Sequence, residues 1–147
     1  MILALLSVSA LADTKWLPSP AVLREHMHAS QSVVVGRLTD VTVQQGAQAR
    51  SGSGRIEVDH FIIGVGRNLP LVTWSDPNDR ICPRVKFDQF KGLRGVWFLR
   101  VDASGAFDRY RSEFWDLNTA ERVLIEIERS EPLSPDLQAL KGAIEFE

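Results

Sequence analysis

Hydrophobic and polar residues alternate along the middle of the chain with the two-residue period of β-strands. Residues Ser32 to Gln45 are rich in valine and threonine, and residues Ile56 to Ile63 alternate in the same way. Between them, Gly46 to Arg55 has the glycine- and serine-rich composition of a flexible hairpin loop. We therefore expect a long β-hairpin, in which Gly36 marks a bulge or a sharp bend.

Three more strands are expected further along the chain, at residues 69–75, 95–102 and 107–111. Turns and loops rich in glycine, aspartate and asparagine separate them. The sequence contains no internal repeat and no linker that would divide it into two domains. Strands at this spacing, with little helix between them, are typical of a small barrel or sandwich.

Helices are expected on both sides of the strand region. Ser19-Pro20 reads as an N-cap followed by proline at the first helical position, and this helix should end near Ser30. Asn118 to Glu121 has the spacing of a capping box and opens a second helix, with a strand as the alternative because the segment is rich in β-branched residues. A last helix follows Ser134-Pro135, and its apolar face would consist of Leu137, Leu140 and Ile144. The predicted fold is mainly β: an OB-like small β-barrel of about five strands with an N-terminal helix and C-terminal helices.

The composition is that of one soluble globular domain. The chain has 147 residues, of which 44% are hydrophobic and 24% charged, enough apolar material for a core without disulfide bonds. Its formal net charge is −2, whereas a dedicated nucleic-acid-binding domain needs a clear excess of positive charge. We therefore expect no nucleic-acid partner and no attraction to anionic membranes.

The first twelve residues have the features of a secretory signal peptide. Residues 1–12 are uncharged and mostly apolar, and they end in Ala10-Leu11-Ala12, a small-residue pattern for cleavage before Asp13. The run is too short to span a membrane, and no basic residue precedes it, so an apolar first strand or helix is the alternative. The expected mature protein is a single OB-like domain, residues 13–147, periplasmic or secreted and not inserted into a membrane after cleavage.

Two short motifs and one cysteine occur in an order found in a known family. Val34 to Leu38 reads V-V-G-R-L in the first strand, Gly95 to Leu99 reads G-V-W-F-L in a later strand, and Cys82 lies in the loop before it. Over residues 30–115 the chain resembles the netrin-like module, the OB-fold barrel shared by tissue inhibitors of metalloproteinases and by small bacterial secreted proteins. The resemblance implies the fold and leaves the activity open.

The chain departs from the inhibitors of that family at its N-terminus. Those inhibitors chelate the zinc of the protease with an N-terminal cysteine, whereas here the expected N-terminus is Asp13 and Cys82 is the only cysteine. That mechanism of inhibition does not carry over, and a protease-inhibitor-like protein without the N-terminal cysteine is kept as an alternative. Cys82 is expected to be a small buried hydrophobe, with an intermolecular disulfide or a reactive thiol as alternatives.

The histidines and carboxylates do not have the spacing of a metal or catalytic site. His26 and His28 are two residues apart and so point away from each other on a helix, and His60 stands alone in a strand. Asp76 to Asp79 resembles the start of a calcium-binding loop, but the later glycine and glutamate are missing, so a turn explains it. We expect no metal and no cofactor. A small secreted hydrolase that uses His60 or His26 as its base is the alternative, although no nucleophile-elbow motif is present.

Aromatic and basic residues of the later strands are the candidates for binding, because OB-folds use such faces to stack bases or sugars. The residues expected to contact a ligand or partner are Trp74, Arg109, Tyr110, Arg111 and Trp115. In the alternative interpretation Trp97 and Phe98 take opposite faces of one strand, one in the core and one covered by the C-terminal helices. The expected function is that of a non-catalytic, exported, monomeric binding module whose partner is a protein or a glycan.

Overall fold

The computed structural model describes residues 17–64, 71–77, 90–101, 107–109 and 111–145. The expected signal peptide, Cys82 and Tyr110 lie outside these ranges, as do Asn78 and Asp79 of the predicted turn. The turn predicted at Asp76 to Asp79 is wrong in its first half, because Asp76 and Pro77 end a strand and pair with Arg50 and Ala49. Within them the helices and strands are α2 (Pro20–Ala29), β1 (Ser32–Gln45), β2 (Ala49–Ile63), β3 (Leu71–Pro77), β4 (Arg94–Leu99), β5 (Phe107–Asp108), β6 (Glu113–Asp116), α3 (Leu117–Glu128) and α4 (Pro135–Glu145).

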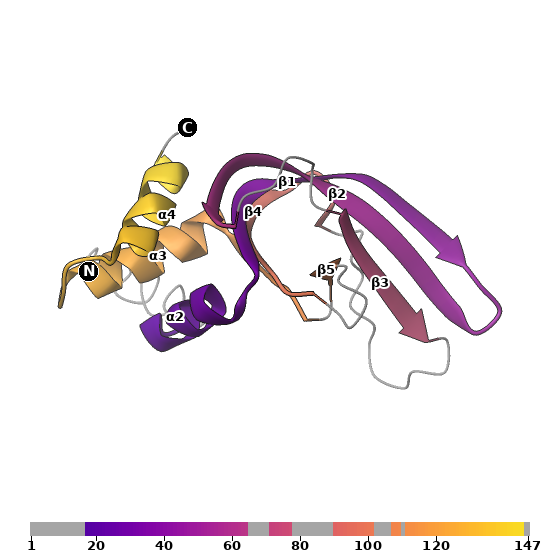
Figure 1. The fold of residues 1–147 in the computed structure, drawn as a ribbon, viewed down its shortest axis with the longest axis horizontal. Coiled ribbons are helices and arrows are strands. Elements are labelled where there is room, and N and C mark those ends of the chain that lie inside the picture. The colour runs from indigo at the N-terminus through magenta and orange to yellow at the C-terminus, as the bar shows by residue number, and fades with distance from the viewer. Residues whose placement is uncertain (1–16, 65–70, 78–89, 102–106, 110, 146–147) are drawn as a thin grey trace, which may run out of the picture.

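The described strands form one curled sheet in the order β5-β3-β2-β1-β4-β6. The curl brings β5 round to the chain just beyond β4. Phe107 of β5 pairs in parallel with Val72 of β3 and also forms an antiparallel bridge with Val101. β6 then runs antiparallel along β4. The sheet is therefore a partly open barrel with helices beside it, which confirms the mainly β, barrel-like fold expected from the sequence (Figure 1).

The strand predicted at residues 107–111 is wrong in its extent. β5 covers only Phe107–Asp108, and β6 follows at Glu113–Asp116, where the sequence pattern predicts no strand. A helical turn separates the two, because Ser112 N donates a hydrogen bond to Asp108 O over 3.0 Å. The buried Ser112 hydroxyl also accepts a hydrogen bond from Arg100 N at 2.9 Å. This turn divides one expected strand into two short ones.

β1 and β2 confirm the long hairpin, but its loop is much shorter than predicted. β2 begins at Ala49 rather than Ile56, so most of residues 46–55 form strand. β3 pairs with this first half of β2 and places Trp74 opposite Gly52. A Cβ atom at position 52 would lie 2.1 Å from the indole ring. The glycine therefore makes room for a large side chain and does not indicate a flexible loop.

β1 bends at bulges along its length. Its pairing with β2 shifts between Val35 and Gly36, which confirms the bend expected at Gly36. A further shift occurs between Thr39 and Thr42, where Asp40 has a φ angle of 52°. Aspartate tolerates this left-handed backbone better than most residues do. The bends let β1 form part of the barrel wall and then continue into the extended hairpin (Figure 1).

The helices expected from the sequence are present. α2 begins at Pro20 and ends just before Ser30, as predicted. α3 is a helix and not the alternative strand, but the capping box predicted at Asn118 is wrong. The N-cap is Asp116, whose side chain accepts a hydrogen bond from Thr119 N at 2.8 Å as the chain leaves β6. None of the described helices is long and apolar enough to cross a membrane.

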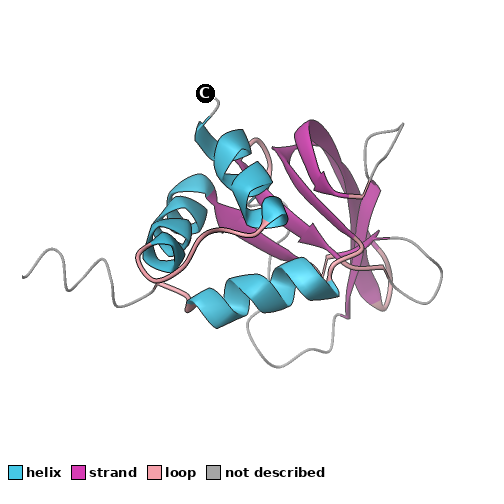
Figure 2. Cartoon of the chain, turned by 60° about the vertical axis from the view of Figure 1, so that its left-hand side comes forward, coloured by secondary structure: helices cyan, strands magenta, loops and turns pink. Residues whose placement is uncertain are grey.

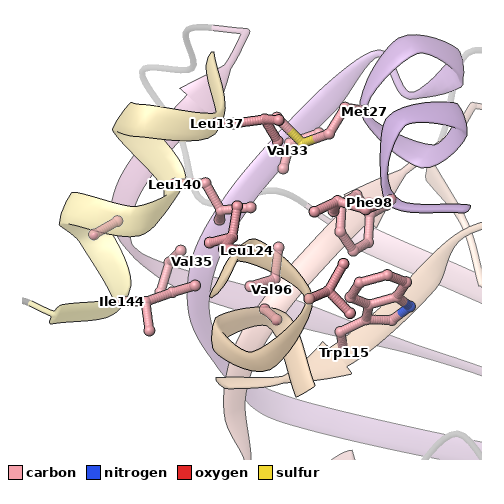
Figure 3. Packing of buried hydrophobic residues seen from close by; sticks show 14 of the residues in the cluster. Met27, Val33, Val35, Val96, Phe98, Trp115, Leu124, Leu137, Leu140 and Ile144 are labelled. Atoms are coloured by element: carbon pink, nitrogen blue, oxygen red, sulfur yellow. The ribbon is translucent and has the colours of Figure 1, made fainter. Parts of the chain in front are cut away.

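The first half of β1 and nearly all of β4 are buried on both faces, which produces two hydrophobic clusters. The barrel core consists of Val34, Leu38, Ile56, Val72, Trp74, Trp97 and Leu99. The helices pack against the outer face of the sheet at one end and leave the far part of the β1–β2 hairpin uncovered (Figures 1 and 2). There, the helix-layer core includes Val33, Val35, Val96, Phe98 and Trp115 of the strands and Met27, Leu124, Leu137, Leu140 and Ile144 of the helices (Figure 3). Trp97 and Phe98 thus take opposite faces of β4, and the apolar face predicted for α4 is buried.

Candidate functional site

The two tryptophans among the predicted binding residues lie on opposite faces of the sheet. Trp74 is 6% exposed and belongs to the barrel core, where its ring lies against Gly52. Trp115 is 7% exposed and packs in the helix-layer core against Phe98, with ring centroids 5.4 Å apart. The structure therefore does not bring the two indole rings together on one surface, and a substitution at either would disturb a core.

The predicted arginines lie around the turn between β5 and β6. The guanidinium of Arg109 sits 5.0 Å from the centroid of the Phe90 ring, and its Nη1 donates to Ser112 O over 3.3 Å. Arg111 Nε is 3.6 Å from the Asp108 carboxylate, and the Arg111 side chain is 62% exposed. Of the described candidates, Arg111 is the one whose charged group lies mostly in solvent. A binding role for this set stays a prediction.

A groove of about 590 Å³ lies elsewhere, between α2, the end of β2 and the connection from α3 to α4. We call it the α2–α4 groove. Its lining residues are Arg24, Met27, His28, Ser30, Ile63, Glu131, Pro132, Leu133, Ser134, Asp136 and Leu137. None of them was a candidate from the sequence, because they come from three segments that are far apart in the chain and have no motif in common.

The α2–α4 groove has an apolar floor and a charged rim. Met27, Leu133 and Leu137 belong to the helix-layer core and form the floor. On the rim, the guanidinium of Arg24 forms an ion pair with the carboxylate of Glu131, and both side chains are about half exposed. A pair so exposed contributes little to stability. It does fix two opposite charges at the edge of an apolar surface.

The groove contains serine, histidine and aspartate, but it does not assemble them for nucleophilic catalysis. The Ser30 hydroxyl donates to His26 O over 2.6 Å, and Ser134 Oγ accepts from Leu137 N at 3.4 Å as the cap of α4. Both hydroxyls therefore stabilise helix ends. In the described part of the chain, no hydrogen bond joins His28 to Asp136 or to either serine. A catalytic triad needs those contacts.

His26 is placed for packing. Its ring centroid lies 5.3 Å from that of Phe98 and 5.7 Å from that of Trp115, and its Nδ1 is buried with no hydrogen-bond partner among the described residues. Burial lowers the pKa of His26 below its ordinary value, and so does Arg100, while the carboxylates of Glu113 and Glu25 act in the opposite direction. The half-buried His26 ring thus forms a cluster of three mutually close rings with Phe98 and Trp115.

The other candidate base, His60, lies half-buried on β2 opposite Val35. The described residues contain no group of three or more His, Cys, Asp or Glu side chains that could hold a metal ion. Comparison with protein-family models, with curated proteins and with solved structures gave no match. The resemblance to the netrin-like module therefore stays a prediction, and function has to be argued from the geometry of this chain.

Proposed function

We propose that this protein is a non-catalytic binding module that works outside the cytoplasm and recognises a protein partner through the α2–α4 groove. The observation that carries the proposal is the combination of an apolar floor, formed by Met27, Leu133 and Leu137, with a rim of charged side chains. An apolar floor accepts a side chain of the partner, and rim charges select among partners. The signal-peptide pattern of residues 1–12 supports the location.

A protein segment suits the α2–α4 groove better than a glycan or a nucleic acid. None of the described residues that line it is Phe, Tyr or Trp, whereas faces that bind bases rely on aromatic rings for stacking. Aliphatic side chains and methionine adapt instead to apolar side chains of another protein. The formal net charge of −2 also disfavours a polyanionic partner.

The engagement of the groove hydroxyls supports binding over hydrolysis. The Ser30 hydroxyl would have to give up the hydrogen bond that it donates to His26 O before a base could take its proton, and Ser134 serves as the cap of α4 by accepting from Leu137 N. His26 would have to leave its aromatic surroundings before acting as a base. A hydrolase built on Ser30 and His26 would need both side chains to rearrange, whereas a binding surface needs no rearrangement.

The test is to capture partners from the extracytoplasmic fraction of the native host, with the full mature chain as bait. The groove variant combines His28→Ala with Asp136→Asn, two exposed positions whose substitution should leave the fold intact. The control is Glu57→Gln, an exposed position on β2 outside the groove. We expect the parent chain and the control to retain a partner that the groove variant loses.

Two outcomes would contradict the proposal. If the parent chain retained no protein, and purified chain hydrolysed an ester substrate in a reaction abolished by Ser30→Ala, the hydrolase alternative would replace it. If the groove variant retained the partner as well as the parent did, the groove would not be the site. The location is tested separately by intact mass, since an exported chain should begin at Asp13 and a cytoplasmic chain would retain residues 1–12.

A further inference from the structure

The α2–α4 groove continues around α4. A second hollow of about 440 Å³ shares Pro132 and Leu133 with it and extends to Lys141 and Glu145. A third hollow, of about 140 Å³, shares Glu128, Lys141 and Glu145 with the second and lies between α3 and α4. Because each hollow shares lining residues with the next, the three adjoin. We call them together the extended groove.

The extended groove has an apolar site at each end. The first is the floor of the α2–α4 groove. At the other end, Leu124 and Ile144 form a buried floor, and Ile125 is 44% exposed at its edge. This end is smaller than the roughly 300 Å³ that a small-molecule pocket usually needs, but it can take one side chain. Two apolar sites on one continuous surface suit a segment with apolar residues along one face.

The charges along the extended groove are predominantly negative. Among the described residues, five carboxylates line it, against one arginine and one lysine. Both cations are already paired: Arg24 with Glu131, and Lys141 with Glu128, whose Oε1 lies 2.9 Å from the lysine Nζ. By contrast, Asp136 and Glu121 form no ion pair within the described ranges.

We propose that the extended groove binds one basic amphipathic segment of a partner protein. The proposal rests on the function proposed above and names the chemistry of its partner. Apolar side chains of the segment occupy the two ends of the groove, and its lysines or arginines face Asp136 and Glu121. The same carboxylates disfavour acidic segments and anionic membrane surfaces, because like charges repel.

Gly142, in the middle of the extended groove, provides a way to block it. A Cβ atom at this position would meet nothing within 4 Å, so a larger side chain extends into the hollow without displacing the protein. Gly142→Trp should therefore obstruct the groove while the fold remains intact. Gly142→Ala is the matched control, because it keeps the groove open and favours the helix.

The probe is a fluorescent peptide of about 18 residues, built from leucine and lysine with the helical period, titrated with the full mature chain. We expect Gly142→Trp to weaken binding about tenfold or more, a large effect for one surface residue, and Gly142→Ala to leave it unchanged. Glu121→Gln with Asp136→Asn should also weaken binding. Glu57→Gln with Glu126→Gln removes the same charge elsewhere on the surface and should not.

Three results would overturn the inference. Gly142→Trp and Gly142→Ala could bind the peptide with equal affinity, or the two pairs of charge-removing substitutions could weaken binding equally. The parent chain could also bind a peptide with glutamate in place of lysine as tightly as the lysine peptide. The capture experiment with the native partner separates failure of the extended groove from failure of the proposed function. A native partner that His28→Ala with Asp136→Asn releases, but Gly142→Trp does not, keeps the proposed function and overturns the extended groove. Peptide binding that depends on Gly142, with no native partner captured, overturns the function instead.

Discussion

The surroundings of His26 on α2 disfavour its charged form. Its ring packs against the rings of Phe98 and Trp115, and burial lowers its pKa below the ordinary value of 6.5. Arg100 adds to the effect, whereas Glu113 and Glu25 oppose it. A histidine with a lowered pKa binds fewer protons in the folded chain than in the unfolded one. Its contribution to stability is therefore present above the unfolded pKa and is lost as the pH falls below it.

We accordingly expect the free energy of unfolding to decrease as the pH is lowered from about 7 to about 5. Urea unfolding at a series of pH values measures this. His26→Phe keeps an aromatic ring at the site and removes the titrating group, so it should flatten the pH dependence, while His28→Ala should retain it. The same slope in His26→Phe as in the parent would show that another group is responsible.

Gly52 has no side chain, and this leaves room for the Trp74 ring to pack against its backbone. A Cβ atom at position 52 would lie 2.1 and 2.3 Å from two atoms of the indole ring and 2.7 Å from Thr42 O. The ring is buried in the barrel core and has little room to move. We expect Gly52→Ala to lower the free energy of unfolding by about 1–3 kcal/mol, the usual cost of overpacking.

The matched control is Gly142→Ala, where the new methyl group meets open space and the helix gains about 0.5–1 kcal/mol. Chemical denaturation of the two variants beside the parent should therefore give shifts of opposite sign. Unchanged stability in Gly52→Ala would mean that Trp74 is not packed on this glycine.

At the scale of elements, Asp116 and Asn118 at the start of α3 have similar side chains but different roles. Asp116 accepts a hydrogen bond from Thr119 N, whereas Asn118 already lies inside the helix. Asp116→Ala should cost about 0.5–2 kcal/mol, the usual cost of losing an N-cap, and Asn118→Ala should cost little. Urea unfolding of both variants measures the difference, and a larger loss for Asn118→Ala would restore the capping box predicted from the sequence.

The elements that the sequence predicts well are those with local causes. Ser19-Pro20 and Ser134-Pro135 mark helix starts, and the valine-rich pattern of β1 marks a strand, because these signals lie within the element itself. The extent of β2 depends instead on pairing with β3, which covers a glycine-rich segment with a tryptophan. β6 depends in the same way on Ser112, whose hydroxyl is held by the backbone of Arg100. Such contacts between distant segments leave no periodic pattern in either one.

At the scale of the whole molecule, the difference between local sequence signals and contacts between distant segments also explains why the predicted site and the α2–α4 groove do not coincide. The sequence favours aromatic residues as binding candidates, but the curl of the sheet decides which of its faces is covered. That curl buries Trp74 in the barrel and places Trp115 under the helices. The groove forms where α2, the end of β2 and the α3–α4 connection meet. Its residues become neighbours only after the chain folds.

The two hydrophobic clusters share β1 and β4, so we expect them to unfold together. Val33 and Val35 point into the helix-layer core, and Val34 between them points into the barrel core. A loss of order on either face would therefore expose the other face of the same strand. This favours one cooperative transition over separate unfolding of barrel and helices.

Two core substitutions test this coupling: Ile56→Ala in the barrel core and Leu140→Ala in the helix-layer core, each of which should cost roughly 2–5 kcal/mol. Unfolding is followed by far-ultraviolet circular dichroism, which is dominated by the helices, and by tryptophan fluorescence. Trp97 lies in the barrel core and Trp115 in the helix-layer core, so fluorescence senses both clusters. Each substitution should move both signals to the same lower midpoint, because each weakens a cluster that is built on β1 and β4, the two strands that the clusters share. If Leu140→Ala moved the dichroism midpoint and left part of the fluorescence change at its original position, the helix layer would unfold independently of the barrel.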